Sequence, residues 1–448
     1  MDKKYKRLGI NTILVLIGNI GSKLVMFLLV PFYTRWLSVD DFGTADTVMT
    51  YAILLLGIAA LSIGEAIFVF PKDKSFNVQQ EYFSSGIAFL VFSTIVSSVA
   101  LFGIEFIVER YGLHGIFVDN IPLIVGILIA MLLQHFVQQF TRSINKMAVY
   151  STTGIVLSLA NVLFSFLLIR KYFVVGYAIT FMLSYFVAAI YSFFMSKSYK
   201  FFSFKAICKE RCIEMLKFCV PLIPKSVMWW LASSLNRPLM ESYLGIAAIG
   251  MYAVVNKIPN IINIIYVSFT KSWVISVIEE FKSEKFNEFY NKVLKTSVLF
   301  LFVMLIVICM SSPLVMKIMA SPSYYAAWTY IPFLTLAAVF VNISSFIGSV
   351  FSASKESKYI FYSSCITTIA AIVFNYVFIS WLGFIGACIA LIFTMASDTV
   401  SIIFFSRKYV KYDNILTYVV LLIIVVVYLL IVYKYQSEII ALLIGCML

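Results

Sequence analysis

Three lysines lie inside apolar stretches of the sequence, where a positive charge is costly. Lys23 and Lys225 occur in GSKLVMFLLVPFYTRWL (21–37) and IPKSVMWWLASSLNRPL (223–239), and Lys257 occurs in VVNKIPNIINIIY. A charge at the bilayer centre costs about 2.5–3.5 kcal/mol on insertion scales, so such residues usually face a cavity or a partner. Lysine and arginine bind phosphate and carboxylate groups through charge-assisted hydrogen bonds. The three lysines therefore indicate a cationic cavity that accepts an anionic ligand.

Asparagines accompany these lysines at helical spacing. Asn256, Lys257, Asn260 and Asn263 recur at i, i+1, i+4 and i+7, which places them on one face of a predicted helix. Asn19 stands one turn before Lys23 in the first apolar stretch. A polar stripe on a membrane helix marks a surface that faces water or other protein. The predicted substrate-binding set is therefore Lys23, Lys225, Lys257, Asn256, Asn260 and Asn19.

Two arginines follow the first two lysines at equal spacing. Arg35 and Arg237 lie about 18 Å further along a helix, at 1.5 Å per residue. This distance predicts a position at the outer rim of the membrane. Substrate capture and simple snorkelling to the interface explain that position equally well.

Two acidic residues and one polar helix end complete the candidate residues. Asp46 and Asp398 lie within apolar stretches, where each is a candidate for carrying a coupling proton or sodium ion or for neutralising a lysine. His135, Gln138 and Arg142 share one face of the stretch QHFVQQFTRSINK. They are candidates for a cytoplasmic entrance, although a capped helix end beside anionic lipid fits the pattern equally well. No catalytic group, metal site or cofactor is expected beyond such a coupling ion.

The elements that must position these residues are membrane-spanning helices. The chain has 448 residues, of which 62% are hydrophobic and 12% charged, and a water-soluble domain has about 25% charged residues. Long apolar runs without strand-like alternation favour helices over a barrel. The expected spans are 9–33, 42–70, 80–108, 117–140, 147–169, 173–195, 212–236, 245–269, 291–319, 326–350, 358–381, 384–406 and 415–433. A final short apolar stretch predicts a partial fourteenth helix.

Lysine and arginine residues gather in alternate loops, on the side that holds the N-terminus. By the positive-inside rule this predicts a multi-pass protein of the cytoplasmic (inner) membrane with a cytoplasmic N-terminus. The net charge of +13 follows from this topology, so no nucleic-acid partner is needed to explain it.

The two halves of the sequence repeat each other. Lys23 and Arg35 match Lys225 and Arg237, and further matches follow in the same order, ending with Gly176 opposite Gly386. Because the matching points are six spans apart, the halves share one orientation and form parallel repeats. The prediction is an all-α protein of two six-helix lobes, related by a pseudo-two-fold axis along the membrane normal, with one or two extra C-terminal helices. The expected parts are an N-lobe (1–196), a cytoplasmic linker (197–211), a C-lobe (212–410) and a C-terminal segment (411–448).

The stretches GNIGSKLVMFLLVPFYTRWLSVDDFGTADTV and LIPKSVMWWLASSLNRPLMESYLGIAAIGMYAVVNKI resemble the MOP flippase superfamily, in particular its polysaccharide transporter branch, which includes the O-antigen flippases. The resemblance covers about residues 8–410. It implies a flippase for polyprenyl-pyrophosphate-linked oligosaccharide that rocks two lobes around a cationic cavity, often coupled to an ion gradient. The expected partners are this lipid-linked substrate, the bilayer and other polysaccharide assembly proteins.

Two other functions compete with this interpretation. A multidrug exporter of the same superfamily would prefer an acidic cavity for its cationic substrates, whereas lysines outnumber acids here. A membrane glycosyltransferase or polysaccharide polymerase needs a sizeable outer loop or domain, and every loop in this sequence is short. We therefore expect a transporter rather than an enzyme.

Overall fold

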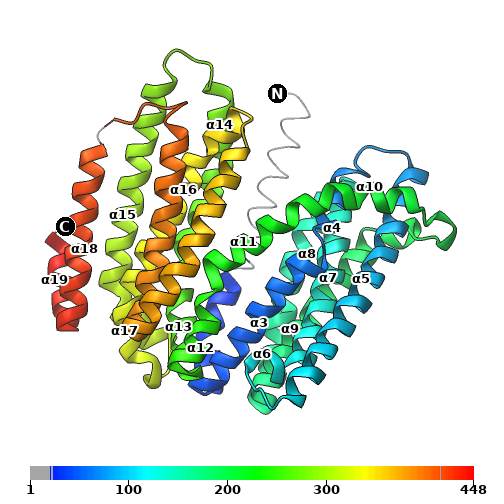
Figure 1. Ribbon diagram of the computed structural model, residues 1–448, viewed down its shortest axis with the longest axis horizontal. Helices are drawn as coiled ribbons and strands as arrows, with labels where there is room; N and C mark the ends of the chain where they lie inside the picture. The colour runs from blue at the N-terminus through cyan, green and yellow to red at the C-terminus, as the bar shows by residue number, and fades with distance from the viewer. Residues whose placement is uncertain (1–20, 22–23, 414, 448) are drawn as a thin grey trace. The chain divides into compact units, whose positions relative to one another are not determined.

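The computed structural model describes residues 21, 24–413 and 415–447, and every regular element in these ranges is a helix (Figure 1). The chain divides into two compact units, Met1–Val227 and Met228–Leu448. The division lies inside α11 (Ile223–Ser234), after the predicted linker. This places Lys225 in the first unit and Lys257 in the second.

Ten helical stretches in the described part of the chain are long and apolar enough to cross a membrane, which makes this a multi-pass membrane protein. Two of them, Met147–Met195 and Lys358–Ser406, have 49 residues each and fold back on themselves. Hydrogen bonds between their two arms demonstrate the hairpins, since Thr152 Oγ1 lies 2.8 Å from Tyr191 Oη and Ser363 Oγ donates to Asp398 Oδ1 at 2.8 Å. Each hairpin supplies two spans, as predicted.

In the first unit, α7 is the most buried of the candidate spans and packs against α3, α4, α5, α8 and α9. Its apolar side chains, including Phe136 and Phe140, form a core with Phe83 of α5. The described helices of this unit are α2 (Val30–Trp36), α3 (Val39–Ala59), α4 (Ile63–Val69), α5 (Phe76–Arg110), α6 (Ile116–Asp119), α7 (Ile121–Ser143), α8 (Met147–Phe164), the π-helical η1 (Ser165–Ile169), α9 (Arg170–Met195), the short 3-10 turns η2 (Ser198–Phe201), η3 (Phe204–Ala206) and η4 (Val220–Leu222), and α10 (Lys209–Cys219).

In the second unit, α16 takes the position that α7 has in the first. It is the most buried candidate span of the unit and packs against α13, α14, α15 and α17. Both helices are the fourth span of their half, so the observed packing follows the repeat in the sequence. The helices of this unit are α12 (Asn236–Leu244), α13 (Ile246–Lys257), α14 (Asn260–Glu280), α15 (Phe286–Met319), the 3-10 helix η5 (Pro322–Tyr330), α16 (Ile331–Ala353), α17 (Lys358–Ser406), α18 (Ile415–Tyr435) and the ten-residue α19 (Glu438–Met447).

Two predicted spans are interrupted. The expected single helix over 42–70 is wrong, because Leu61 and Ser62 have left-handed φ values of 43° and 57° between α3 and α4. Ser93 Oγ donates to the carbonyl oxygen of Ala59, and Cys219 Sγ donates to that of Ser62 at 3.3 Å. These neighbours satisfy carbonyl groups at the break, which is the condition for broken helices within a membrane.

The second interruption falls inside the predicted span 245–269. The helix ends at Lys257 and resumes at Asn260, with Pro259 between them. Proline lacks the N–H group that a continuous helix requires. Lys257 and the asparagines therefore do not share one face of a single helix. They lie at the C-terminal end of α13 and the N-terminal end of α14.

The segment after α9 packs back onto the first unit. Ser85 Oγ of α5 donates to the carbonyl oxygen of Cys208 at 3.2 Å and accepts from the N–H of Cys208 at 2.9 Å. Arg211 pairs with Glu81 at 3.0 Å. These contacts explain why this linker belongs structurally to the first unit.

Candidate functional site

Lys257 lies beside a row of asparagines where α13 ends. Its side chain is half-buried, and so is that of Asn256. Asn260 Nδ2 donates to the carbonyl oxygen of Asn256 at 3.0 Å, and Asn263 Nδ2 donates to Asn260 Oδ1 at 3.0 Å. The structure therefore brings three of the predicted binding residues together despite the helix break.

The row continues onto a residue that the sequence did not single out. Asn342 of α16, which is buried, donates to Asn263 Oδ1 at 2.7 Å and to the carbonyl oxygen of Ala338 at 2.7 Å. Asn342 thus ties α14 to the central helix of the unit. We define Asn256, Asn260, Asn263 and Asn342 as the asparagine row. An asparagine isolated in an apolar stretch is a weak signal by itself, because its partner comes from a distant helix.

Of the other two predicted lysines, the structure describes one. Lys225 is in the first turn of α11 with an exposed side chain, and it belongs to the first unit. Lys23 and Asn19 lie outside the described residues. The predicted three-lysine cavity therefore stays a prediction.

The two matching arginines have different surroundings. Arg35 at the end of α2 is exposed, and its Nη1 donates to the carbonyl oxygen of Pro31 at 3.1 Å. Arg237 in α12 is buried, with its guanidinium carbon 5.6 Å from the ring centre of Tyr252. An exposed rim position describes Arg35 but not Arg237, whose charge is held inside the second unit by a cation–π contact.

Asp398 sits among hydroxyl groups in the second unit. Ser363 Oγ and Thr367 Oγ1, from the other arm of α17, both donate to Oδ1 at 2.8 Å. Ser344 Oγ of α16 donates to Oδ2. Among the described residues, no lysine or arginine forms an ion pair with this carboxylate, so its observed partners are neutral. A carboxylate within a shell of hydroxyl oxygens offers hard ligands that suit a small cation or a proton.

Asp46 occupies a different environment in the first unit. It is buried on α3 and lies within electrostatic range of Tyr177 of α9. Nearby, Tyr33 of α2 lies 3.0 Å from Asn161 Oδ1 and 2.9 Å from Ser165 Oγ, where α8 turns into the π-helical η1. Local π-helical geometry often occurs at functional sites. This cluster is not predictable from the sequence, since π-helical geometry has no clear residue signature.

The predicted entrance residues bridge helices of the first unit. His135 of α7 packs directly against Gly64 of α4, where a side chain would collide with the imidazole ring. Gln138 accepts a hydrogen bond from Gln134 and donates to the carbonyl oxygen of Tyr150 at 3.0 Å. Arg142 lies 3.9 Å from the ring centre of Phe68. Because all three are half-buried in contacts among α4, α7 and α8, they hold the helices together at the predicted entrance.

Comparison with known proteins shows the family to which the chain belongs. Residues 8–282 match the family model described as polysaccharide biosynthesis protein. The chain belongs to this family. A curated relative, the Lsg locus putative protein 1 of Haemophilus influenzae, is 32% identical over 96 residues, which are 21% of this chain and 22% of the relative. The chain therefore spans less than a quarter of the curated relative it matches.

Two solved structures of similar fold align with most of this chain. The lipid II flippase MurJ, in an inward closed conformation, aligns with a TM-score of 0.70 at 17% identity, over 99% of this chain and 96% of that one. An inward-facing MATE family multidrug resistance transporter of the MOP superfamily aligns with a TM-score of 0.68 at 15% identity, over 86% and 94%. The chain therefore shares the fold of these two transporters.

Proposed function

We propose that this protein is a flippase that moves oligosaccharide units linked to polyprenyl pyrophosphate from the cytoplasmic to the outer leaflet of the cytoplasmic membrane. Membership of the polysaccharide biosynthesis family and the MurJ-like fold support this assignment. The units would be repeats of O-antigen or of another surface polysaccharide. They would be passed on to other assembly proteins, and the N-terminus would lie in the cytoplasm.

Lys257 and the asparagine row are the structural basis of the proposal. An ammonium group binds the pyrophosphate as a point charge, while carboxamides both donate to and accept from sugar hydroxyls. The helix break at Pro259 brings these groups together at the junction of α13 and α14. Together they provide charge for the pyrophosphate and neutral hydrogen bonds for the sugar, which a flippase substrate requires at one place.

Transport would proceed by alternating access through a cationic cavity to which Lys23 and Lys225 would also contribute. Asp398 is the favoured coupling residue, because its carboxylate is bonded by neutral hydroxyl groups and can take up a proton or a sodium ion without competition from a described lysine. Asp46 is the corresponding candidate in the first unit.

Complementation of a flippase-null strain tests the proposal. Lys257→Ala is expected to reduce surface polysaccharide at least tenfold, because a lost charge-assisted contact to phosphate is worth about one order of magnitude or more. Lys257→Arg should retain much of the activity, and Lys434→Ala, which changes an exposed lysine, is the matched control. Protein in the membrane is quantified in each strain. Normal polysaccharide from the Lys257→Ala strain at normal protein levels would refute the role of Lys257.

A multidrug exporter is the second candidate function, favoured by the likeness to the MATE transporter and by the buried Asp46. The two candidates make opposite predictions. An exporter would raise resistance to cationic drugs in a sensitive strain without restoring polysaccharide, and Asp46→Asn rather than Lys257→Ala would abolish its activity.

A further inference from the structure

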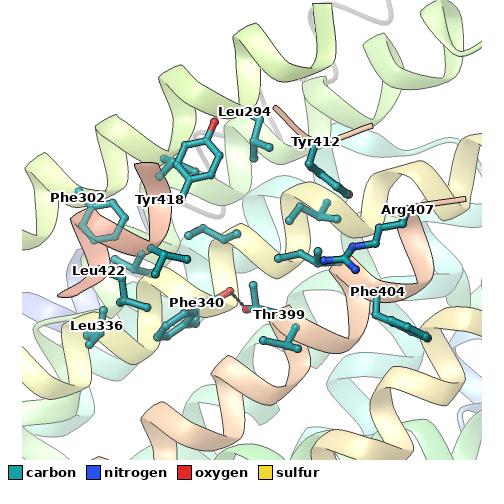
Figure 2. A pocket seen from close by; sticks show the side chains of 17 residues that line it. Leu294, Phe302, Leu336, Phe340, Thr399, Phe404, Arg407, Tyr412, Tyr418 and Leu422 are labelled. Carbon is teal, nitrogen blue, oxygen red and sulfur yellow. Dashed lines mark hydrogen bonds between the residues drawn. The ribbon is translucent and has the colours of Figure 1, made fainter. Parts of the chain in front are cut away.

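A cavity of about 440 Å³ lies within the second unit, separate from Lys257 and the asparagine row. It runs between α15, α16, the second arm of α17 and α18 (Figure 2). Along α16 its lining extends from Leu336 to Ile347, which is about 17 Å of helix at 1.5 Å per residue. One leaflet of a bilayer has about 15 Å of hydrocarbon, half of the total thickness. The cavity therefore matches the depth of one leaflet.

The lining is polar at one end and apolar at the other. Figure 2 shows Arg407 and Tyr412 at one end and Phe302, Leu336 and Leu422 toward the other. Among the described residues that line the cavity, Arg407 alone carries a charge. This polarity corresponds to that of a lipid, with a charged group at the membrane surface and hydrocarbon below it.

The hydroxyl group of Thr399 in the cavity wall is already bonded within the protein. Thr399 Oγ1 donates to the carbonyl oxygen of Phe340 at 3.0 Å, so its hydroxyl is occupied by the helices. Val400 and Phe404 on the cavity edge are each 65% exposed, which leaves the cavity open toward the surrounding hydrocarbon. A chain of methylene groups can enter from the side, and the Tyr418 hydroxyl is the one further polar side-chain group among the described lining residues besides Arg407, Tyr412 and Thr399.

Acidic residues near Arg407 do not neutralise it. Glu356 is bound by Lys358 at 2.7 Å and by Lys408 at 3.6 Å. The Lys358 ammonium lowers the pKa of Glu356 to about 2, so this carboxylate is ionised and already paired. Asp413 is exposed and forms no ion pair with Arg407 in the described part of the chain. The exposed guanidinium of Arg407 is therefore available to an anion at the membrane surface.

We propose that this cavity binds one chain of an anionic glycerophospholipid whose phosphate pairs with Arg407. Three features of the cavity define this ligand. The cavity is as long as one leaflet is deep, its two ends differ in polarity, and Arg407 is the one charged residue among the described lining residues. The guanidinium holds a phosphate through two parallel hydrogen bonds, and the apolar side chains of the lining pack against the acyl chain through van der Waals contacts. The bound chain fills the space between α18 and the rest of the second unit. The site is independent of the proposed flippase substrate.

Lipid retention measured by native mass spectrometry tests the site. Full-length protein is exchanged into nanodiscs that contain equal amounts of phosphatidylglycerol and phosphatidylcholine, and the lipid that remains bound after release is identified. The wild-type protein is expected to retain phosphatidylglycerol in preference to phosphatidylcholine. Arg407→Gln should lower that retention about tenfold, as one lost charge-assisted pair implies, while Arg407→Lys retains part of it.

Two matched controls separate this site from general lipid contacts. Lys411→Gln removes a neighbouring exposed cation that does not line the cavity, and it should leave retention unchanged. Ile343→Trp fills the cavity and should lower retention, whereas Ile369→Trp, on an exposed part of α17, should not. Equal retention by Arg407→Gln and wild-type protein would overturn the proposal. Preferential binding of added polyprenyl phosphate over phosphatidylglycerol would also overturn it, by assigning the cavity to the carrier lipid.

Discussion

The hairpins of the two units share one backbone geometry but form it with different residues. In the first unit the chain turns at Phe173, with φ of 47°, and in the second it turns at Gly383, with φ of 62°. The loop before each hairpin contains one left-handed residue with φ of 61°, which is Asn145 in the first unit and Lys355 in the second. Left-handed φ suits glycine and asparagine far better than phenylalanine or lysine. Each unit therefore keeps the same chain path with one well-suited and one poorly suited residue.

The polar groups of the units have diverged further than the backbone. Arg35 is exposed while Arg237 is buried against Tyr252. Asp398 is surrounded by hydroxyl groups, and Asp46 is buried within electrostatic range of Tyr177. The comparison indicates that the repeat conserves a scaffold, whereas each unit has its own charge chemistry.

Substitution of the close-packed glycines should have the largest effect, and it should be equal in the two units. A side chain at Gly176 or Gly386 would collide with the carbonyl oxygen of Leu168 or Phe378, in the preceding arm of the same hairpin. Gly176→Ala and Gly386→Ala should each cost about 3 kcal/mol or more and leave little monodisperse protein in detergent size-exclusion chromatography.

Gly348→Ala is the control for both variants. Its added methyl group would meet the side chain of Ile402 at 3.6 Å, an ordinary contact, so normal yield is expected. A well-folded Gly386→Ala protein beside a misfolded Gly176→Ala protein would show that the two hairpins are not equivalent.

The next prediction places ion coupling in the second unit. Asp398→Asn keeps an acceptor for Ser363 and Thr367 but removes the charge, so folded protein should remain while transport falls at least tenfold. Gradient-driven uptake in proteoliposomes measures this loss, with Asp413→Asn as an exposed control. If Asp46→Asn abolishes the gradient dependence and Asp398→Asn does not, coupling belongs to the first unit instead.

A smaller effect should distinguish the two hairpin turns. Phe173 is 51% exposed, so its replacement by glycine loses little packing and relieves a left-handed backbone cost of about 1–2 kcal/mol. Phe173→Gly should therefore raise the Tm, and Gly383→Ala should lower it by a similar amount. Thermal unfolding followed by tryptophan fluorescence measures both shifts. A fall in Tm for Phe173→Gly would mean that the phenylalanine ring contributes more packing than the turn costs.

Much of this scaffold was predictable because membrane helices depend on the length of apolar runs. The Gly176–Gly386 match, found in the sequence, corresponds to the same close approach in both hairpins. The sequence also contains a signal for the break at Pro259, since proline interrupts helices. The single span predicted there was nevertheless wrong. The break at Leu61 and Ser62 has no such signal, because neither residue favours left-handed φ.

The candidate site was only partly predictable for a different reason. Lys257 and its neighbouring asparagines were identified because an i, i+4 pattern lies within one segment. Asn342 and Ser344, in contrast, reach their partners from α16, and the sequence alone does not pair residues on separate helices. Burial of Arg237 but not Arg35 likewise depends on what packs around each helix end.

The smallest expected effect concerns the loops before the two hairpins. In the first unit Asn145 Nδ2 donates to Asp73 Oδ1 at 3.2 Å, and in the second Lys358 and Lys408 bind Glu356. The hydrogen bond and charge of Lys358 lower the pKa of Glu356 to about 2. Because its pKa is lowered in the folded protein, the ionised Glu356 stabilises the fold at pH values above the ordinary glutamate pKa of about 4.3. This contribution is lost as the pH falls through about 2. Because exposed pairs contribute little, Glu356→Gln should lower the Tm only slightly.

The pH range over which this small Tm difference persists distinguishes the ion pairs of Glu356 from the hydrogen bond that the neutral amide of Asn145 donates to Asp73. The difference between wild-type and Glu356→Gln protein should stay constant from pH 7 to about pH 4, and it should shrink toward zero near pH 2. Added salt should reduce it at neutral pH, since exposed charges are screened. Asp73→Asn, where the donor is a neutral amide, should show a weaker salt dependence. If the Glu356→Gln difference vanishes already near pH 4, the two lysines do not hold the carboxylate, and the loops of the two units are chemically alike.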